Sequence, residues 1–359
     1  MTESEILYWL SISGLTVRRQ AQMILSAGGI KQLESKFFDS EQLKKIASDK
    51  YLTMKRTFSS DYLRESIKKL KADGVNVATQ LNPLYPELLK QPEVCAPFAF
   101  YYKGNLELLN TNCIAVVGTR AVSSYGRRMT EKFTKSLVEN GFTIVSGLAT
   151  GVDGIAHEVA LDNNGKTIAV LGSGHNYVNP VSHTELYNRI LENDGLIISE
   201  YKPDVNATKF TFPERNRIIS GLSKGVLVIE AGEKSGSLIT ANFALEQGRD
   251  VFAVPGNLDS SRSVGTNNLI YSGATMVRSG EDICSHYGIS SNQKKNKNID
   301  TLDSEEKKVY EILQDETSFD DLIEQTGILP QNLSVILVKL EMEGLIKRTS
   351  MDNYLITEN

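Results

Sequence analysis

The sequence of 359 residues predicts an α/β protein whose core is a parallel β-sheet with helices on both faces. From residue 113 onward, short apolar runs alternate with amphipathic segments of helix length. The runs are continuously apolar, which is typical of strands buried on both faces, and their alternation with helices is typical of a parallel sheet. Helical periodicity near both ends of the chain predicts a smaller domain before the core and another after it.

The first 75 residues are predicted to form an N-terminal helical domain. Apolar residues such as Leu7, Leu10 and Val17 recur near helical spacing, and Gly28-Gly29 is a helix stop signal. Four prolines between residues 83 and 97 then break the periodicity. We therefore expect a connector over residues 76–110.

The core is predicted to cover residues 111–287. Its strands are expected at the apolar runs 113–117, 142–145, 167–171, 196–198, 225–229 and 251–254. Its helices are expected at the segments 124–140, 152–163, 182–193, 213–221 and 237–248. The crossovers between parallel strands should be right-handed.

The last part of the chain is predicted to be a flexible linker followed by a winged helix-turn-helix domain. Residues 288–300 are polar and nearly lack apolar side chains, as flexible linkers do. Residues 301–359 contain helical segments at 304–314, 319–325 and 331–342, and then a possible hairpin of residues 345–347 and 354–356. Three helices followed by a small hairpin are typical of a winged helix.

The charge of the chain is unevenly distributed. The net charge is -5 and the pI is near 5.6, which argues against a broadly basic protein that coats nucleic acid. However, residues 301–359 hold 5 Lys/Arg and 13 Asp/Glu, so the acidic excess belongs to the last domain and the rest of the chain is net positive. A local basic pocket therefore remains compatible with the composition.

Composition also predicts the cellular setting. No apolar run reaches the roughly 18–20 residues of a membrane helix, and the acidic first residues do not resemble a signal peptide. The three cysteines are far apart, so neither a disulfide framework nor a paired-cysteine zinc site is expected. We expect a cytoplasmic protein with no membrane partner.

Several predicted strands end in turns of small residues that open a helix. These turns are Gly118-Thr119-Arg120, Ser146-Gly147, Gly172-Ser173-Gly174 and Ser235-Gly236-Ser237. The carboxyl ends of parallel strands share one edge of the sheet, where ligands bind. Glycines admit a ligand close to the backbone, and helix N-termini attract anions. The pattern favours an anionic ligand, and the alternative is that these glycines serve packing alone.

The spacing of the turns argues against common cofactors and metals. Neither G-x-G-x-x-G nor a Walker-type lysine is present, so nicotinamide and ATP have little support and no cofactor is expected. His157 follows Asp153 by four residues but has no third ligand nearby. We expect a packing hydrogen bond there and no metal site.

Cations and aromatics accompany the turns. Arg120 lies inside the first turn, where a guanidinium suits a phosphodiester, although a surface ion pair is an alternative. Lys234 precedes the last turn and could meet another phosphate.

Residues 209–217 (KFTFPERNR) combine three cations with two phenylalanines just before a predicted helix. Cations for phosphates and aromatics for base stacking are typical of single-stranded nucleic acid binding. The alternatives are that Phe210 and Phe212 pack in the core, and that Arg217 pairs with Glu200 or Glu230.

In order along the chain, these motifs resemble the DNA-processing protein A (DprA/Smf) family. The matching stretches are 116–120, 146–149, 151–153 with 156–157, 212–222, 235–241, 254–256, 265–267, 269–270 and 273–274. They cover roughly residues 100–287, and the arginine-asparagine-arginine and SGSLITA segments are highly specific. One loop departs, because Asn179-Pro180 and His183 stand where the family usually has Tyr-Pro followed soon by Asn.

The resemblance implies an extended Rossmann-like core that binds single-stranded DNA without sequence preference. It also implies a homodimer that helps to load the RecA recombinase onto incoming strands during natural transformation. The family's pocket uses the residues that correspond here to Arg120, Lys209 and Phe212. Its dimer seam corresponds to the apolar residues Leu269, Ile270 and Met276.

The ends of the chain match less specifically. Residues 10–16 with Ala21 and Ile24 are similar to a helix-hairpin-helix, so the N-terminal domain is expected to be of the SAM or helix-hairpin-helix kind, and a structural or protein-binding role is an equal alternative. The winged helix is similar to that of many family members. Its helix 331–342 offers only Lys339 as a cation and carries Glu341, so we expect protein contact or regulation there rather than DNA binding.

The leading hypothesis is therefore a non-enzymatic, single-stranded DNA-binding recombination mediator. Its predicted DNA-binding residues are Gly118, Thr119, Arg120, Ser146, Gly147, Gly172, Lys209, Phe212, Arg215, Asn216, Arg217, Lys234, Ser235 and Gly236. One rival is a nucleotide-cleaving glycosidase or phosphoribohydrolase with Glu230 as its carboxylate. Another is a scaffold with a vestigial pocket, whose acidic C-terminal domain recruits a partner.

Overall fold

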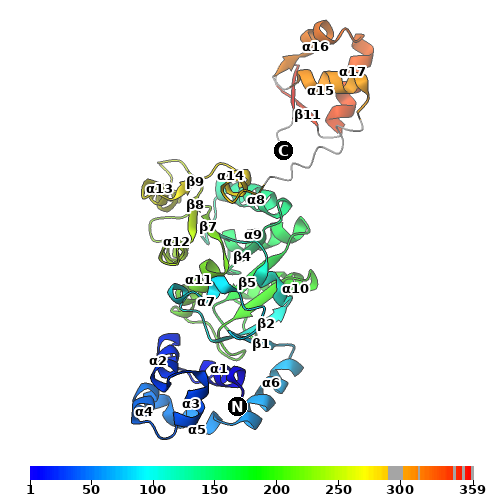
Figure 1. Cartoon of the computed structure of the whole chain (residues 1–359). Coiled ribbons are helices and arrows are strands. Elements are labelled where there is room, and N and C mark those ends of the chain that lie inside the picture. Colours follow the sequence, from blue (N-terminus) through cyan, green and yellow to red (C-terminus); the bar gives the residue numbers. More distant parts are fainter. Residues whose placement is uncertain (290–301, 314–315, 343–344, 350–351, 357–359) are drawn as a thin grey trace. The chain divides into compact units, whose positions relative to one another are not determined.

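A nine-stranded β-sheet forms the centre of the protein, in the order β1-β2-β6-β5-β4-β3-β7-β8-β9 (Figure 1). The strands are β1 (Asn76–Thr79), β2 (Ala99–Gly104), β3 (Cys113–Val117), β4 (Thr143–Ser146), β5 (Thr167–Leu171), β6 (Leu196–Ser199), β7 (Gly225–Val228), β8 (Asp250–Ala253) and β9 (Thr275–Met276). The strands from β6 to β9 in this order are parallel, whereas β1 and β2 are antiparallel at one edge. The predicted α/β class and its six core strands are confirmed.

This computed structural model describes residues 1–289, 302–313, 316–342, 345–349 and 352–356. The chain divides into two compact units, residues 1–291 and 292–359. Apart from its first two residues, the predicted linker lies outside the described residues. Within the described ranges, no helix is long and apolar enough to cross a membrane.

Helices cover both faces of the sheet. One face carries α8 (Ser124–Glu139), α9 (Val152–Asp162), α10 (Thr184–Glu192) and α14 (Gly280–His286), and the other carries α11 (Thr211–Leu222) and α12 (Gly236–Glu246) (Figure 1). In β3, Ile114 and Val116 pack in the cluster with α8, whereas Cys113 and Ala115 pack in the cluster with α11. Because both faces are buried, the strand had to be apolar at every position.

The chain changes direction across the sheet at β3. It runs from β3 through β4 and β5 to β6, and then returns to β7 and β8 on the other side of β3. The helices that follow the neighbouring strands β3 and β7 therefore lie on opposite faces. The carboxyl ends of two such strands form a topological switch point, where open α/β sheets bind ligands.

Six helices precede the sheet: α1 (Glu3–Ser11), α2 (Val17–Ala27), α3 (Ile30–Lys36), α4 (Glu41–Ala47), α5 (Tyr51–Thr57) and α6 (Ser60–Ala72). They surround Trp9, whose ring centroid lies 4.8 Å from that of Phe37 and 4.7 Å from that of Phe58. Tyr101 of β2 belongs to the same apolar cluster, so these helices pack against the antiparallel edge of the sheet. The prediction of a connector over residues 76–110 is wrong in that β1 and β2 lie there and pair into the sheet, and the four prolines between them hide these short strands in the sequence.

The second unit is a winged helix. It contains α15 (Ser304–Ile312), α16 (Phe319–Thr326), α17 (Pro330–Met342) and a small sheet in the order β10-β12-β11. The strands are β10 (Thr317–Ser318), β11 (Ile346–Arg348) and β12 (Asn353–Ile356), and β11 and β12 pair antiparallel to form the wing. The predicted winged-helix fold is confirmed, and α17 leaves Val335, Val338 and Met342 exposed.

A buried histidine connects α9 to the sheet. His157 Nδ1 lies 2.6 Å from Thr167 Oγ1, and that hydroxyl donates its own proton to the carbonyl of Ile144. Nδ1 must therefore be the donor, and Nε2 is an unprotonated nitrogen without a hydrogen-bond partner among the described residues. Burial lowers the pKa of His157 to about 3, because a proton on Nε2 would place an unpaired charge in the core.

We expect His157 to make the protein less stable in mild acid. The unfolded chain protonates this imidazole near pH 6.5 and the folded chain only near its pKa of about 3, so the unfolded state binds more protons between these values. Stability is full above pH 6.5 and falls as the pH decreases, by about 2 kcal/mol at pH 5 from this group alone. Urea unfolding at pH 7 and pH 5 measures the loss, which should be smaller in His157→Asn. An equal pH dependence in the parent and the variant would contradict this assignment.

Candidate functional site

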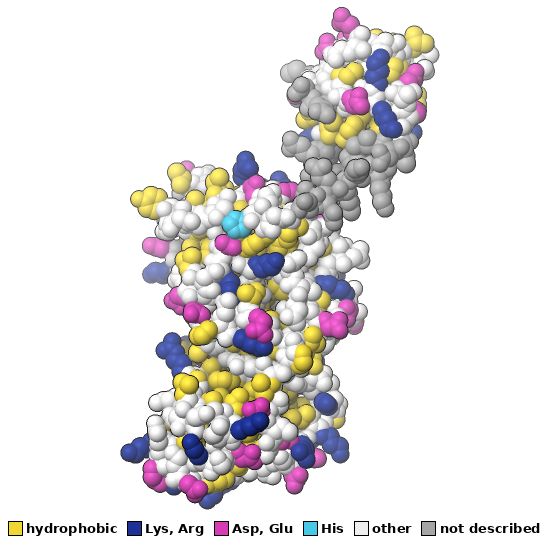
Figure 2. All heavy atoms as spheres, in the orientation of Figure 1, with side chains coloured by type: hydrophobic (Ala, Val, Ile, Leu, Met, Phe, Trp, Pro, Cys, Tyr) yellow, Lys and Arg dark blue, Asp and Glu magenta, His cyan; other side chains and the backbone are white. Residues whose placement is uncertain are grey.

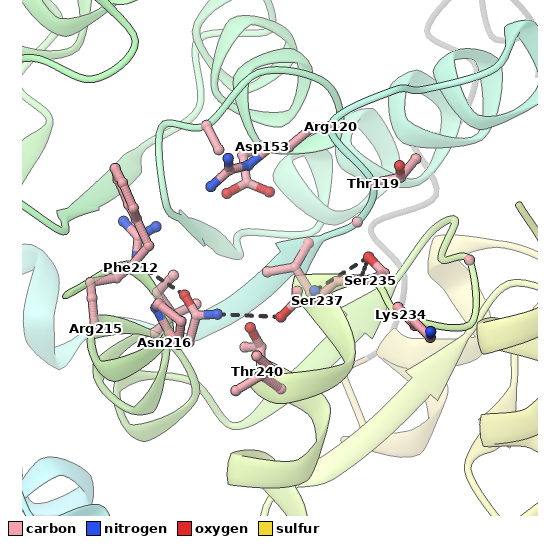
Figure 3. Close-up of a pocket in the computed structure, with 18 of the residues that line it drawn as sticks. Thr119, Arg120, Asp153, Phe212, Arg215, Asn216, Lys234, Ser235, Ser237 and Thr240 are labelled. Atoms are coloured by element: carbon pink, nitrogen blue, oxygen red, sulfur yellow. Dashed lines mark hydrogen bonds between the residues drawn. The ribbon is translucent and has the colours of Figure 1, made fainter. Parts of the chain in front are cut away.

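A cavity of about 580 Å³ opens at the carboxyl ends of β3 and β7. Its walls are the turns after β3 and β4, the first half of α11 and the N-terminus of α12 (Figure 3). Of the residues predicted from the sequence, those that line it are Gly118, Thr119, Arg120, Lys209, Phe212, Arg215, Asn216, Lys234, Ser235 and Gly236. The structure thus brings together, at the switch point, residues that are more than a hundred positions apart in the chain.

The charge of the cavity wall is predominantly positive. Four cations line it, whereas Asp153 is the one carboxylate among the described lining residues. Arg120, Lys209 and Lys234 are exposed. Figure 3 shows Phe212 and Lys234 at opposite ends of the cavity, with Arg120 and Asp153 across from α11. An anion that enters this space meets cations from separate elements.

Arg215 is buried within the wall. Its Nη1 donates to the carbonyl of Gly147 at 2.9 Å and to that of Val170, and its Nε donates to Asn216 Oδ1 at 3.1 Å. Burial lowers the pKa of Arg215 to about 10, with the charge of Asp153 opposing the shift, so the guanidinium stays protonated at neutral pH. Burial also raises the pKa of Asp153, which Arg215 partly counteracts.

Phe212 presents its ring beside Arg120. The guanidinium carbon of Arg120 lies 5.4 Å from the ring centroid, within cation–π distance. Behind the ring is Gly172, where a methyl group would come within 2.8 Å of the Phe212 Cδ1 atom. Glycine at this strand end therefore provides the space that the aromatic ring occupies.

The N-terminus of α12 forms another wall. Ser235 is the N-cap, and its Oγ accepts from the Ser237 amide at 3.4 Å and lies 2.8 Å from Ser237 Oγ. Asn216 Nδ2 donates to the carbonyl of Gly236 at 3.4 Å, so α11 and α12 are linked directly beside the cavity (Figure 3). The first amides of a helix carry partial positive charge and suit an anion.

Four predicted residues lie outside the cavity lining. Ser146 is buried and donates its Oγ proton to the carbonyl of Val116 at 2.7 Å. Gly147 and Gly172 lie behind Arg215 and Phe212. Arg217 pairs with Glu200 at 2.5 Å, both nearly buried, as in one alternative that the sequence left open. Two residues correspond to about 200° around a helix, so Arg217 faces away from Arg215.

Several lining residues are not among those predicted from the sequence. Asp153 is predicted there only as a partner of His157, and Ser237, Ile239 and Thr240 are not predicted as binding residues. Ser237 and Thr240 are three positions apart on α12 and therefore share a helix face with each other. The SGSLITA motif shows this spacing in the sequence. Only the packing of α12 beside α11 shows that this helix face lines the cavity.

The predicted dimer residues lie at the β9 edge of the sheet. Met276 is 49% exposed on β9, the last strand, while Leu269 and Ile270 on α13 (Val264–Tyr271) are half-buried. Tyr271 and Leu258 nearby in the chain are 94% and 85% exposed. Figure 2 shows apolar side chains exposed at this end of the core.

The described residues give little support for a metal site or for the enzymatic rival with Glu230 as its carboxylate. No group of three or more His, Cys, Asp or Glu side chains there could hold a metal ion. Glu230, the candidate carboxylate of the enzymatic rival, is buried. Its oxygens accept from the Ser123 amide at 2.9 Å and from Ser123 Oγ at 2.6 Å.

Two protein-family models match most of the chain. A family model described as "DNA recombination-mediator protein A" matches residues 76–288, and one described as "DprA winged helix domain" matches residues 293–350. Protein Smf of Escherichia coli is 49% identical over 55% of this chain and 52% of its own length. DNA processing protein DprA of Streptococcus pneumoniae is 50% identical over 54% of this chain and 67% of its own. The match therefore spans about half of the Escherichia coli protein.

Solved structures are also similar. The crystal structure of DNA processing protein A from Streptococcus pneumoniae superposes with a TM-score of 0.67 at 39% identity, over 79% of this chain and 98% of that one. DNA processing protein A from Helicobacter pylori, described for its unique single-stranded DNA binding mode, gives a TM-score of 0.53 at 31% identity, over 59% of this chain and 95% of that one.

We expect Gly147→Ala to destabilise the protein and Gly236→Ala to leave it unchanged or slightly more stable. A methyl group at Gly147 would lie 2.5 Å from Arg215 Nη2 and 2.8 Å from Asp153 Oδ2, whereas one at Gly236 meets no described heavy atom within 4 Å. Such crowding costs about 1–3 kcal/mol, and alanine favours a helix over glycine. Urea unfolding at pH 7 measures both variants. Equal stability of the two would contradict the bracing role of Arg215.

Proposed function

The chain belongs to the family of DNA recombination-mediator protein A, and on that premise we propose that its cavity binds single-stranded DNA without sequence preference. The observation that carries the proposal is the convergence of Arg120, Lys209 and Lys234 with the half-buried ring of Phe212 in one cavity. Cations and an aromatic face together suit a phosphodiester backbone and an unpaired base.

Each wall has a role in this proposal. Arg120, Lys209 and Lys234 neutralise phosphates, and the amides at the start of α12 donate hydrogen bonds to phosphate oxygens. Phe212 stacks on a base. Contacts to phosphates and to the face of a base carry no sequence information, because sequence is read from the base edges. Binding is therefore independent of sequence.

The residues behind the wall have a positioning role in the same proposal. Arg215 holds the turn after β4 through the carbonyl of Gly147 and holds β5 through the carbonyl of Val170, and Gly172 leaves the space that the Phe212 ring occupies. Asn216 holds α12 against α11. Arg217, in its ion pair with Glu200, fixes the opposite side of α11 and is not proposed as a phosphate ligand.

The cellular role that we propose is that of a non-enzymatic recombination mediator in the cytoplasm. In this role the protein takes up incoming single strands during natural transformation and hands them to RecA. The names of the similar proteins support this assignment, and the Helicobacter pylori relative is described for its single-stranded DNA binding mode. The hydrogen bonds from Ser123 to Glu230 support a structural carboxylate at the start of α8 rather than a catalytic one.

The winged helix has a different role in this proposal, that of contact with a protein. Lys339, the single cation in the sequence of α17, donates to Glu306, and the helix leaves Val335, Val338 and Met342 exposed. An acidic domain with an apolar helix face repels phosphate and favours a protein surface.

We expect the double variant Arg120→Ala, Lys209→Ala to bind oligo-dT more weakly and with a shallower salt dependence. Each lost phosphate contact lowers the slope of log affinity against log salt by about 0.7, so two contacts lower it by about 1.4. Titration of oligo-dT binding over a salt series measures this. The control is Lys166→Ala, Arg278→Ala, which removes two surface cations outside the cavity lining. Unchanged affinity of the first variant at moderate salt would show that the pocket assignment is wrong.

We propose that the protein is a homodimer through the β9 edge, and we expect Met276→Arg to make it monomeric. Exposed Leu258, Tyr271 and Met276 provide an apolar surface beside an edge strand, and a buried arginine without a partner would oppose association. Sedimentation equilibrium measures the mass. The control, Leu52→Arg, places the same charge at an exposed leucine of α5. A parent chain that is monomeric at micromolar concentration would contradict the proposal.

A further inference from the structure

Phe210 is an exposed aromatic residue next in the chain to Lys209, which lines the cavity. Its side chain is 70% exposed, although it stands between Lys209 and the Thr211-Phe212 pair that leads into the cavity wall. Single exposed apolar residues are common on protein surfaces. This one stands one residue after a lining lysine and two residues before the lining phenylalanine.

The backbone around Phe210 is fixed by a local network. Thr208 Oγ1 accepts from the amides of Phe210 and Thr211, both at 3.3 Å, and Thr211 Oγ1 accepts from the Thr208 amide at 2.9 Å. The carbonyl of Phe210 accepts from the Glu214 amide at 3.2 Å, so Phe210 is the N-cap of α11. The exposed ring is therefore attached to an ordered helix start, and little backbone ordering is needed when it binds a ligand.

The two phenylalanines are each paired with a cation. The ammonium of Lys209 lies 5.0 Å from the ring centroid of Phe210, and the guanidinium carbon of Arg120 lies 5.4 Å from that of Phe212. The Phe212 ring is half-buried and packs over Gly172, whereas the Phe210 ring is open to solvent. Each pair combines a flat face for a base with a cation for a phosphate, the two requirements of single-strand binding.

We propose that Phe210 is a second stacking platform, which holds the base of the nucleotide next to the one stacked on Phe212. The Cα atoms of the two phenylalanines are at most about 7 Å apart along the chain, within reach of neighbouring nucleotides. Lys209 then binds the phosphate that leads to the second base. The bound strand leaves the cavity over the start of α11. This inference rests on the proposed function and adds the direction in which the strand runs.

The test compares four side chains at position 210 in the full-length protein. Loss of one stacked base weakens binding by about 5- to 150-fold. We expect that loss in the oligo-dT dissociation constant of Phe210→Ala and most of it in Phe210→Leu, which keeps apolar bulk but has no aromatic face. Phe210→Trp should bind at least as tightly as the parent. The salt slope should stay unchanged in all three variants, because position 210 has no charge, whereas Arg120→Ala should lower it.

Abasic DNA separates stacking from disturbance of the loop. On an abasic oligonucleotide of equal length, Phe210→Ala and the parent should bind equally, because there is no base to stack. Arg120→Ala should still weaken binding there. The non-additivity of the side-chain change and the base removal isolates the contact between them.

A direct optical signal completes the test. Trp9, the single tryptophan of the sequence, is buried in α1, so Phe210→Trp adds one exposed tryptophan. Its fluorescence should be quenched by oligo-dT and not by the abasic strand, with the parent as control.

Three results would overturn the inference: oligo-dT affinity unchanged in Phe210→Ala, an equal loss on abasic DNA, or no quenching in Phe210→Trp. If Arg120→Ala still weakens binding in those cases, the proposed function stands without the second platform. If the parent itself does not bind oligo-dT, the proposed function and this inference both fail.

Discussion

The buried guanidinium of Arg215 is the interaction on which the candidate site depends. Its charge has left water, so its protons must be satisfied by the protein. They are directed to the carbonyls of Gly147 and Val170, at the ends of β4 and β5, and the carboxylate of Asp153 lies nearby. These contacts fix α11 against the strand ends. Phe212, one helical turn earlier, is thereby held over Gly172 and beside Arg120.

The two sides of helix α11 have different roles, because one side lines the cavity and the other anchors the helix. Phe212, Asn216 and Ile219 recur at intervals of three and four and line the cavity. Arg217 lies on the opposite side, in its ion pair with Glu200. The same residues that look like a uniform basic cluster in the sequence therefore form a cavity wall on one side of the helix and an anchor on the other. This is the reason that the density of arginines overstates the number of candidate phosphate ligands.

The sequence predicted the core strands and the location of the site because both follow from simple physical rules. Strands such as β3 and β5 are buried on both faces; β3 is apolar at every position and β5 at every position after Thr167, and the ends of parallel strands share an edge. The short strand β9 and the pair β1 and β2 carry no comparable signal. The sequence also does not indicate which glycines face the cavity and which lie behind its wall. Gly147 and Gly172 resemble ligand-binding turns in the sequence, but in the fold they make room for the side chains of Arg215 and Phe212.

The net charge of -5 has little influence on what the cavity attracts, because electrostatic effects between exposed charges fade over about 10 Å at 0.1 M salt. An anion in the cavity lies close to the four cations that line it, and Asp153 is the one carboxylate among the described lining residues. Arg120, Lys209 and Lys234 are exposed and therefore determine the local field. A protein with an acidic total can thus present a cationic site, provided that the charges of the site belong to elements that the fold holds together.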